Sequence, residues 1–184
     1  MLEKQAATRV YLIRHATPDW SRTDIPYLIP PGPPLIPKGE KEAEQLGVFI
    51  RVEGIKKLYN SPFERTRRTA EISSKIAGID TVDDNELSEM QSGESESHLL
   101  DRVLPAWVRA ENESKLNGPL GLVTHGGLVL VLLRHLGLSE KNLNDHCKTY
   151  DHANPLPPAG VWLAQRTGDR DPWKLDLAFV SKTV

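Results

Sequence analysis

The stretch VYLIRHATPDW, residues 10–20, joins a strand to a group of reactive side chains. Its first residues are apolar and β-branched without a polar alternation, which predicts a strand over residues 8–13 that is buried on both faces. The run stops at Arg14 and His15, and Ala16, Thr17 and Pro18 then turn the chain. A cation and an imidazole together at the end of a buried strand indicate a functional site.

Further strands and helices are predicted on both sides of a proline-rich loop at residues 26–37. Strands are predicted over residues 55–59, 81–82, 119–123, 161–166 and 174–180. Helices are predicted over residues 38–52, 62–77, 98–113 and 128–136, the second capped by Ser61 with Pro62 at its first position. Residues 83–97, DDNELSEMQSGESES, are acidic and aperiodic, which predicts a surface loop.

The alternation of strands and helices predicts an α/β fold. We expect a three-layer α/β/α sandwich with a mostly parallel central sheet and helices on both faces. The length of 184 residues suits one substantial core, and the chain shows no repeat or linker, so a single domain over residues 1–184 is predicted.

Composition narrows the classes of partner. A net charge of -2 and a pI near 6.3 argue against a general nucleic-acid or membrane-surface binder. Cys147 is the single cysteine, which excludes an internal disulfide and a cysteine zinc site. The N-terminal residues lack a signal-like apolar core, and no run approaches the roughly 20 apolar residues of a membrane span. A soluble, cytoplasmic protein is expected.

Three predicted strands end in the same manner, in LIRHA, LYNSPFER and GLVTHGG. In open α/β sheets ligands bind outside the carboxyl ends of the strands, so these ends would bring together Arg14, His15, Arg65 and His125. A guanidinium matches phosphate oxygens bidentately, and Gly126-Gly127 at a helix N-terminus would let backbone N–H groups approach the same anion. The pattern predicts a phosphate pocket.

Five segments resemble the motifs of the histidine phosphatase family, the phosphoglycerate mutase-like proteins of branch 1. LIRHATPDWS is similar to L-x-R-H-G-x-T-x-W-N, and SPFERTRRTAE is similar to S-P-x-x-R-A-x-x-T-A. PLIPKGEKEA, LSEMQSGESE and VTHGG resemble the remaining motifs, and all five occur in family order.

The resemblance implies a role for each matched residue. His15 would be the nucleophile that becomes a phosphohistidine, while Arg14, Arg65 and His125 would hold the phosphoryl oxygens. Glu89 would donate a proton to the leaving group and then activate water, with a raised pKa keeping it protonated near neutrality. Neither a metal nor another cofactor is expected, since fixed cations would neutralise the phosphate.

Several positions depart from the family pattern or leave a choice open. Ala16 replaces the usual glycine, and Ser21 replaces an asparagine that commonly contacts the phosphate. Arg22 is expected at the mouth of the site, and Gly126 at the substrate. The acid is selected from a loop that also holds other carboxylates, Glu86, Glu94 and Glu96, because only Glu89 fits the spacing from Gly93.

The expected activity is hydrolysis by a phosphoric monoester hydrolase of the histidine acid phosphatase type, acting on a small phosphorylated metabolite. Family mutases carry a long basic and proline-rich insertion after the acidic motif, and here Gly93 is followed within a few residues by a predicted helix. Two alternatives stay open: a cofactor-dependent phosphoglycerate mutase and a non-catalytic module that binds a phospho-ligand or a protein. The physiological substrate and the oligomeric state, including a homodimer, are also open.

Overall fold

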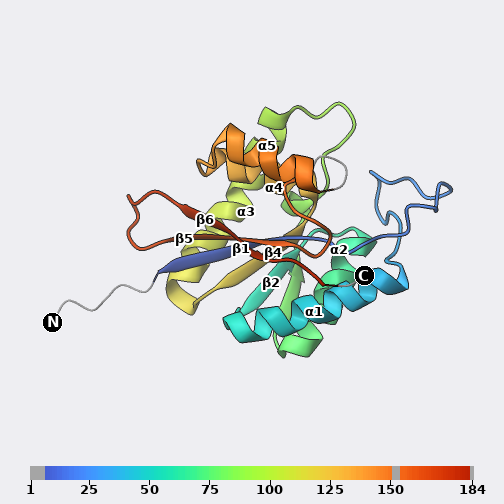
Figure 1. Cartoon of the computed structure of the whole chain (residues 1–184), viewed down its shortest axis with the longest axis horizontal. Coiled ribbons are helices and arrows are strands. Elements are labelled where there is room, and N and C mark those ends of the chain that lie inside the picture. The colour runs from blue at the N-terminus through green and yellow to red at the C-terminus, as the bar shows by residue number, and fades with distance from the viewer. Residues whose placement is uncertain (1–6, 151–153, 183–184) are drawn as a thin grey trace.

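The computed structural model describes residues 7–150 and 154–182, which form one six-stranded sheet with flanking helices (Figure 1). The strand order is β3-β2-β4-β1-β5-β6. The strands are β1 (Thr8–Arg14), β2 (Lys57–Asn60), β3 (Asp80–Asp83), β4 (Leu120–Thr124), β5 (Val161–Arg166) and β6 (Lys174–Phe179). The helices are α1 (Pro37–Glu53), α2 (Glu64–Ala77), the 3-10 turn η1 (Asn85–Leu87), α3 (Glu96–Asn117), α4 (Gly126–His135) and α5 (Glu140–Thr149).

The sheet is mixed. Strands β3, β2, β4 and β1 are parallel, while β5 and β6 are antiparallel to their neighbours. A short turn between β5 and β6 forces the chain straight back, which only an antiparallel pair permits. The prediction of a mostly parallel sheet therefore holds for β1 to β4, and β5 and β6 add an antiparallel edge.

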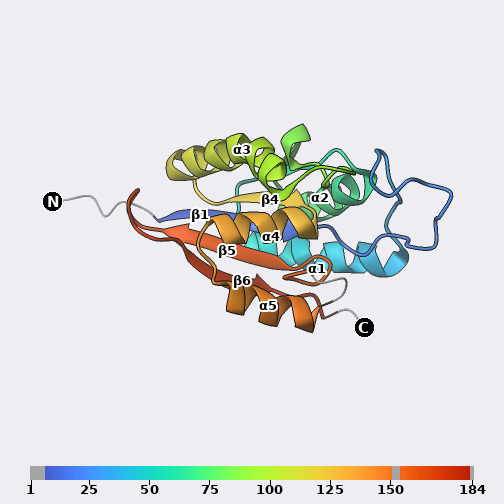
Figure 2. The ribbon, with the colours of Figure 1, turned by 90° about the horizontal axis from the view of Figure 1, so that it is seen from above.

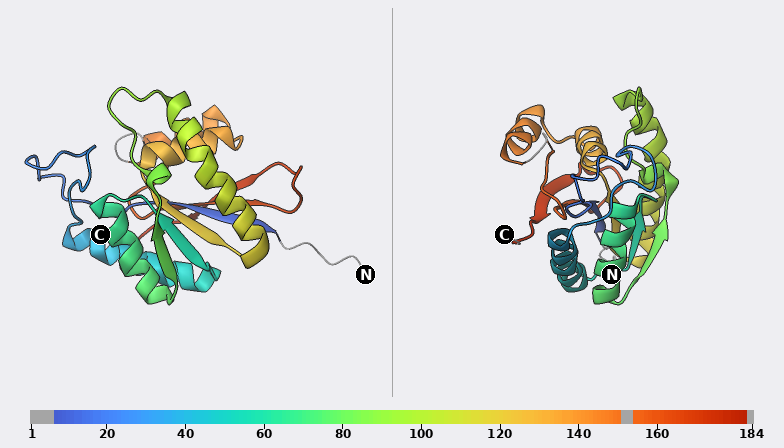
Figure 3. Two further views of the ribbon diagram at one scale, coloured as in Figure 1. Left: turned by 180° about the vertical axis from the view of Figure 1, so that it is seen from behind. Right: turned by 90° about the vertical axis from the view of Figure 1, so that its right-hand side faces the viewer.

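Two helical layers cover the sheet, as predicted. Helices α3, α4 and α5 lie on one face, and α1 and α2 lie on the other (Figures 1 and 3). Strand β1 shows how the sequence makes both layers: Val10 and Leu12 belong to the core with α3 and α4, while Tyr11 and Ile13 belong to the core with α1 and α2. A strand that is apolar on both faces must be covered twice.

Two local predictions need correction. Helix α2 begins at Glu64 with Phe63 as its N-cap residue. Ser61 is not the cap, because its hydroxyl contacts His125, which directly follows β4. Helix α5 is absent from the predicted elements. It buries only Leu143, which leaves no apolar periodicity to detect, although Ser139 caps it by accepting a hydrogen bond from the Asn142 N–H. Figure 2 shows α5 beside α4, on the side of β6. No helix within the described residues is long and apolar enough to span a membrane.

Candidate active site

The carboxyl ends of β1, β2 and β4 converge, as the sequence predicts. The parallel register sets Arg14 beside Thr124, and the His15 N–H donates to the Thr124 carbonyl at 2.9 Å. The rings of His15 and His125 then lie with their centroids 5.3 Å apart. Two residues distant by more than a hundred positions thus meet because their strands are neighbours in the sheet.

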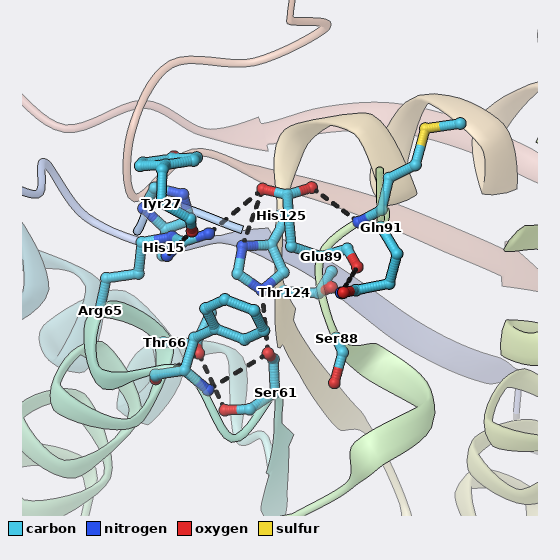
Figure 4. A network of polar contacts seen from close by, with 12 residues as sticks. His15, Tyr27, Ser61, Arg65, Thr66, Ser88, Glu89, Gln91, Thr124 and His125 are labelled. Atoms are coloured by element: carbon cyan, nitrogen blue, oxygen red, sulfur yellow. Dashed lines mark hydrogen bonds and ion pairs between the residues drawn. The ribbon is translucent and has the colours of Figure 1, made fainter. Parts of the chain in front are cut away.

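A cavity of about 370 Å³ opens at these strand ends. Of the predicted residues, Arg14, His15, Glu89 and Gly126 line it. The other lining residues are Trp20, Tyr27, Gly127 and Asn154. Arg65 and His125 are fully buried, and the Glu89 carboxylate contacts both of them (Figure 4).

His15 is held as a neutral imidazole. Its Nδ1 lies 2.8 Å from the carbonyl oxygen of Ala16, and a carbonyl only accepts, so Nδ1 carries the hydrogen. Burial, followed by the charges of Arg65, His125 and Arg14, holds the pKa of His15 well below its ordinary value of 6.5. The Nε2 lone pair is therefore available at neutral pH, which is the form that a nucleophile needs.

His125 is oriented by partners on both ring nitrogens. Its Nδ1 lies 3.2 Å from Glu89 Oε2, and its Nε2 lies 2.9 Å from the hydroxyl of Ser61. The contact of Nδ1 with Glu89 is an ion-pair contact without hydrogen-bond geometry, so the hydrogen bond of this ring is the one between Nε2 and the Ser61 hydroxyl. Burial lowers the pKa of His125, although Glu89 opposes the shift. Ser61, which was predicted as a helix cap, therefore helps to orient the His125 ring.

Two buried guanidiniums stand beside the imidazoles. Arg14 donates to the Leu156 carbonyl at 3.0 Å. Arg65, from the first turn of α2, donates to the Tyr27 carbonyl at 3.2 Å and to Glu89 Oε2 at 3.3 Å. Arginine keeps its charge at any working pH, so the site has a fixed positive potential suited to an anion.

Glu89 is the carboxylate of the acidic loop that reaches the cavity. Its protonation differs from the prediction: burial raises its pKa, but the close contact with His125 and the charge of Arg65 outweigh burial and lower the pKa to about 2. The prediction of a raised pKa is wrong because the carboxylate lies against the cationic group of Arg65 and beside His125. Met90 adds a backbone N–H bond to Glu89 Oε1 at 3.1 Å.

Arg102 of α3 holds the segment that carries Glu89. Its guanidinium donates to the carbonyls of Glu86 and Ser88 at 2.9 and 3.1 Å and pairs with Glu94 at 2.9 Å. The segment is also anchored by Leu87, which is fully buried and whose carbonyl accepts from Thr124 Oγ1 at 2.7 Å. A loop predicted as a solvated surface segment is therefore fixed against the core.

Two predicted binding residues lie elsewhere. Ser21 is exposed and donates from its hydroxyl to Asp19 at 2.5 Å. Arg22 is exposed and pairs with Asp24 at 2.8 Å. Neither is among the residues described as lining the cavity, because the turn after Trp20 directs both toward local carboxylates. The sequence predicted neither Tyr27 nor Asn154 at the cavity, since each belongs to a segment without periodicity.

His15, Glu89 and His125 also form a group whose ligand atoms all lie within 4.8 Å of one another. Two imidazoles and a carboxylate are an acceptable donor set for a transition metal. Arg65 already compensates Glu89, however, and with Arg14 it would repel a dication at this point. The residues fit an anion better than a metal ion.

Comparison with known proteins shows which family this chain resembles. Residues 10–98 match the model of the histidine phosphatase superfamily, branch 1. The probable phosphoglycerate mutase GpmB of Citrobacter koseri is 37% identical over 95 residues, which cover 52% of this chain and 44% of that protein. Residues 10–98 of this chain are therefore similar to the histidine phosphatase superfamily. Its members catalyse phosphoryl transfer or hydrolysis. The match spans less than half the length of this curated relative.

Solved histidine phosphatase structures share the fold over nearly the whole chain. A mycobacterial glucosyl-3-phosphoglycerate phosphatase superposes with a TM-score of 0.72 at 18% identity, covering 96% of this chain and all of that one. A phosphoglycerate mutase from Bacillus anthracis superposes with a TM-score of 0.74 at 14% identity, covering 95% and 93%. Phosphatases and a mutase therefore share this architecture, and the fold alone does not choose between them.

Gly126 is predicted to be essential for the shape of the cavity. A Cβ added there would lie 1.6 Å from Asn154 Oδ1, so Gly126→Ala must displace Asn154 or the start of α4. We expect Gly126→Ala to bind orthovanadate at least about tenfold more weakly and to lose about 1–3 kcal/mol of stability. Gly127→Ala is the matched control, since its Cβ would meet only Glu89 Oε1 at 3.9 Å. Equal vanadate affinities for the two variants would contradict this account.

The buried histidines predict an acid-sensitive fold. His15 and His125 both have lowered pKa values, so below pH 6.5 the unfolded chain takes up protons that the folded chain does not. The free energy of unfolding should fall with pH from about 6.5 downward, by up to about 1.4 kcal/mol per pH unit for each histidine. Urea unfolding between pH 7.5 and 5 measures the slope. His15→Asn should reduce this slope, and an unchanged slope would show that His15 titrates normally in the folded state.

Proposed function

We propose that this protein is a metal-independent phosphomonoesterase that acts through a phosphohistidine on His15. We also propose that residues 1–184 form a single domain. One observation carries the proposed activity: the Nδ1–H of His15 is fixed by the Ala16 carbonyl, which leaves Nε2 unprotonated at a cavity that Arg14 lines, with buried Arg65 paired to the lining carboxylate of Glu89. A neutral imidazole beside fixed cations is arranged to attack phosphorus while the cations stabilise the equatorial oxygens.

The proposed reaction has two steps. His15 Nε2 forms a bond to phosphorus as the bond from phosphorus to the ester oxygen breaks, and Glu89 gives its proton to that oxygen. A water molecule then attacks the phosphohistidine, with Glu89 taking the water proton, and releases inorganic phosphate and free His15. Glu89 is therefore the general acid of the first step and the general base of the second.

Glu89 must gain a proton before the first step. Its contacts with His125 and Arg65 lower its pKa to about 2. A phosphate dianion that takes over these partners removes their influence and adds negative charge, both of which raise the pKa of Glu89. Substrate binding is therefore expected to be coupled to proton uptake by the enzyme.

Hydrolysis is favoured over transfer by the length of the segment after the acidic motif. Gly93 is followed by α3, which begins at Glu96, so no inserted segment covers the cavity there. Water can then reach a phosphohistidine, which a mutase must prevent. The name of the GpmB relative keeps phosphoglycerate mutase as the competing function.

The deciding experiment measures phosphate release from p-nitrophenyl phosphate between pH 5 and 8, with and without EDTA. We expect release that EDTA does not change and that His15→Ala abolishes. A parallel assay supplies 3-phosphoglycerate with 2,3-bisphosphoglycerate, and mutase turnover that exceeds phosphate release would overturn the hydrolase assignment. Absence of both activities would favour a phospho-ligand-binding module.

A further inference from the structure

The cations of the site are all placed for a single phosphate. These cations are Arg14, at the end of β1, and Arg65, in the first turn of α2, and both lie beside the two histidines in the inner part of the site. Among the described lining residues, the remaining side chains are those of Trp20, Tyr27, Glu89 and Asn154. This part of the wall therefore offers no second cation for a carboxylate or another phosphate on the leaving group.

Trp20 and Tyr27 form an aromatic wall at the cavity. Their rings are stacked, with centroids 5.3 Å apart and an interplanar angle of 24°. The Tyr27 ring also lies over the guanidinium of Arg65, 4.2 Å from the ring centroid. Tyr27 thus contacts both Arg65 and Trp20, which places the aromatic wall next to the phosphate site. Trp20 is 44% exposed.

The segment that carries this wall, residues 18–35, includes most of the proline-rich loop, and contacts between its two ends anchor it. Near its base, Pro18 bridges to Leu35, and the Asp19 N–H donates to the Pro34 carbonyl at 2.8 Å. Farther along, Gly32 has a φ of 68° and passes so close to Arg65 that a Cβ would lie 2.7 Å from its Nη1. The wall is thus preorganised, which lowers the entropy cost of binding against it.

The same loop exposes further apolar side chains next to Tyr27. Leu28 is 37% exposed and Ile29 is 60% exposed. Large apolar side chains grouped beside a cavity mark a binding surface more often than chance exposure does. Figures 1 and 3 show this loop extending beyond the body of the protein near the start of α1.

We infer that Trp20, supported by Tyr27, is the leaving-group subsite and that it selects phosphate monoesters of uncharged alcohols with an aromatic ring. This inference rests on the proposed function for its catalytic meaning, because it assigns the part of the substrate that leaves. The inner cations hold the phosphate, and the ring stacks on the exposed face of Trp20. Esters with an anionic alcohol, such as phosphoglycerates, find no counter-charge on the described wall.

The test compares ligands that differ only in the ring. Benzylphosphonate and ethylphosphonate cannot be hydrolysed, so calorimetry measures their binding whether or not the protein turns over a substrate. We expect the native protein to bind benzylphosphonate about tenfold more tightly than ethylphosphonate, since stacking and apolar burial favour the ring. Trp20→Ala should remove most of this ratio, whereas Trp20→Phe should retain it in large part.

Matched controls separate the subsite from general effects. Leu116→Ala removes an apolar side chain that is 84% exposed on α3, and it should leave the ratio unchanged. Kinetics with benzyl phosphate and ethyl phosphate, both esters of primary alcohols, should give the same preference in kcat/KM, and ribose 5-phosphate and 3-phosphoglycerate should be poorer substrates than benzyl phosphate.

Two results would overturn the inference: a benzyl-to-ethyl binding ratio near one in the native protein, or a ratio that survives in Trp20→Ala. Preference for the sugar ester or for 3-phosphoglycerate would also overturn it. Failure of the proposed function is distinct, because it appears as absence of His15-dependent turnover with every ester, while the phosphonate binding ratio still reports on the subsite.

Discussion

Replacing His15 by asparagine is expected to lower kcat for phosphate release by at least about 10⁴-fold, since the variant has no nucleophile. Asparagine is small enough for the fully packed site, and its amide N–H₂ can replace Nδ1 as the donor to the Ala16 carbonyl. The fold should therefore persist while the Nε2 lone pair is lost. Initial rates with p-nitrophenyl phosphate measure the effect.

The phosphoenzyme gives a second readout for the same substitution. The native protein, quenched during turnover of a ³²P-labelled ester, should carry a label that acid removes and alkali does not, as a phosphoramidate requires. The label should be absent from His15→Asn. His135→Asn is the matched control, because His135 is exposed at the end of α4 and should keep both the label and the rate. Retention of activity in His15→Asn would disprove the phosphohistidine mechanism.

Replacing Glu89 by glutamine should separate binding from chemistry. The amide cannot donate a carboxyl proton, so kcat is expected to fall by about 10²–10⁴-fold. The negative charge that Glu89 places beside Arg65 and His125 is also lost, so orthovanadate should bind more tightly than to the native protein. A variant that only disturbed the structure would weaken both properties.

Proton uptake on vanadate binding gives a second test of the role of Glu89. Vanadate binding to the native protein should take up protons, because the anion raises the pKa of Glu89 from about 2. Calorimetry in buffers of different ionisation enthalpy measures this uptake, which should be smaller in Glu89→Gln. Glu96→Gln is the control from the same acidic region, since Glu96 pairs with Arg134 and is 57% exposed. If kcat is unchanged in Glu89→Gln, another group supplies the proton.

Local patterns in the sequence predicted most of the framework. The apolar run before Arg14 depends on residues that are neighbours in the sequence, which is why it can be read along the chain. Helix α5 escaped prediction because its stability does not come from an apolar face. Ser61 was misassigned because a serine before a helix usually caps it, and nothing local reveals a histidine 64 positions away.

The sequence by itself determined an α/β fold and the delivery of Arg14, His15, Arg65 and His125 to the strand ends, since strand length and residue order are local properties. Only the tertiary structure decided the charge of Glu89 and the aromatic wall of Trp20 and Tyr27. Both depend on which loops meet across the cavity. Electrostatic shifts and stacking act through space, so they arise from packing between segments that no short stretch of sequence contains.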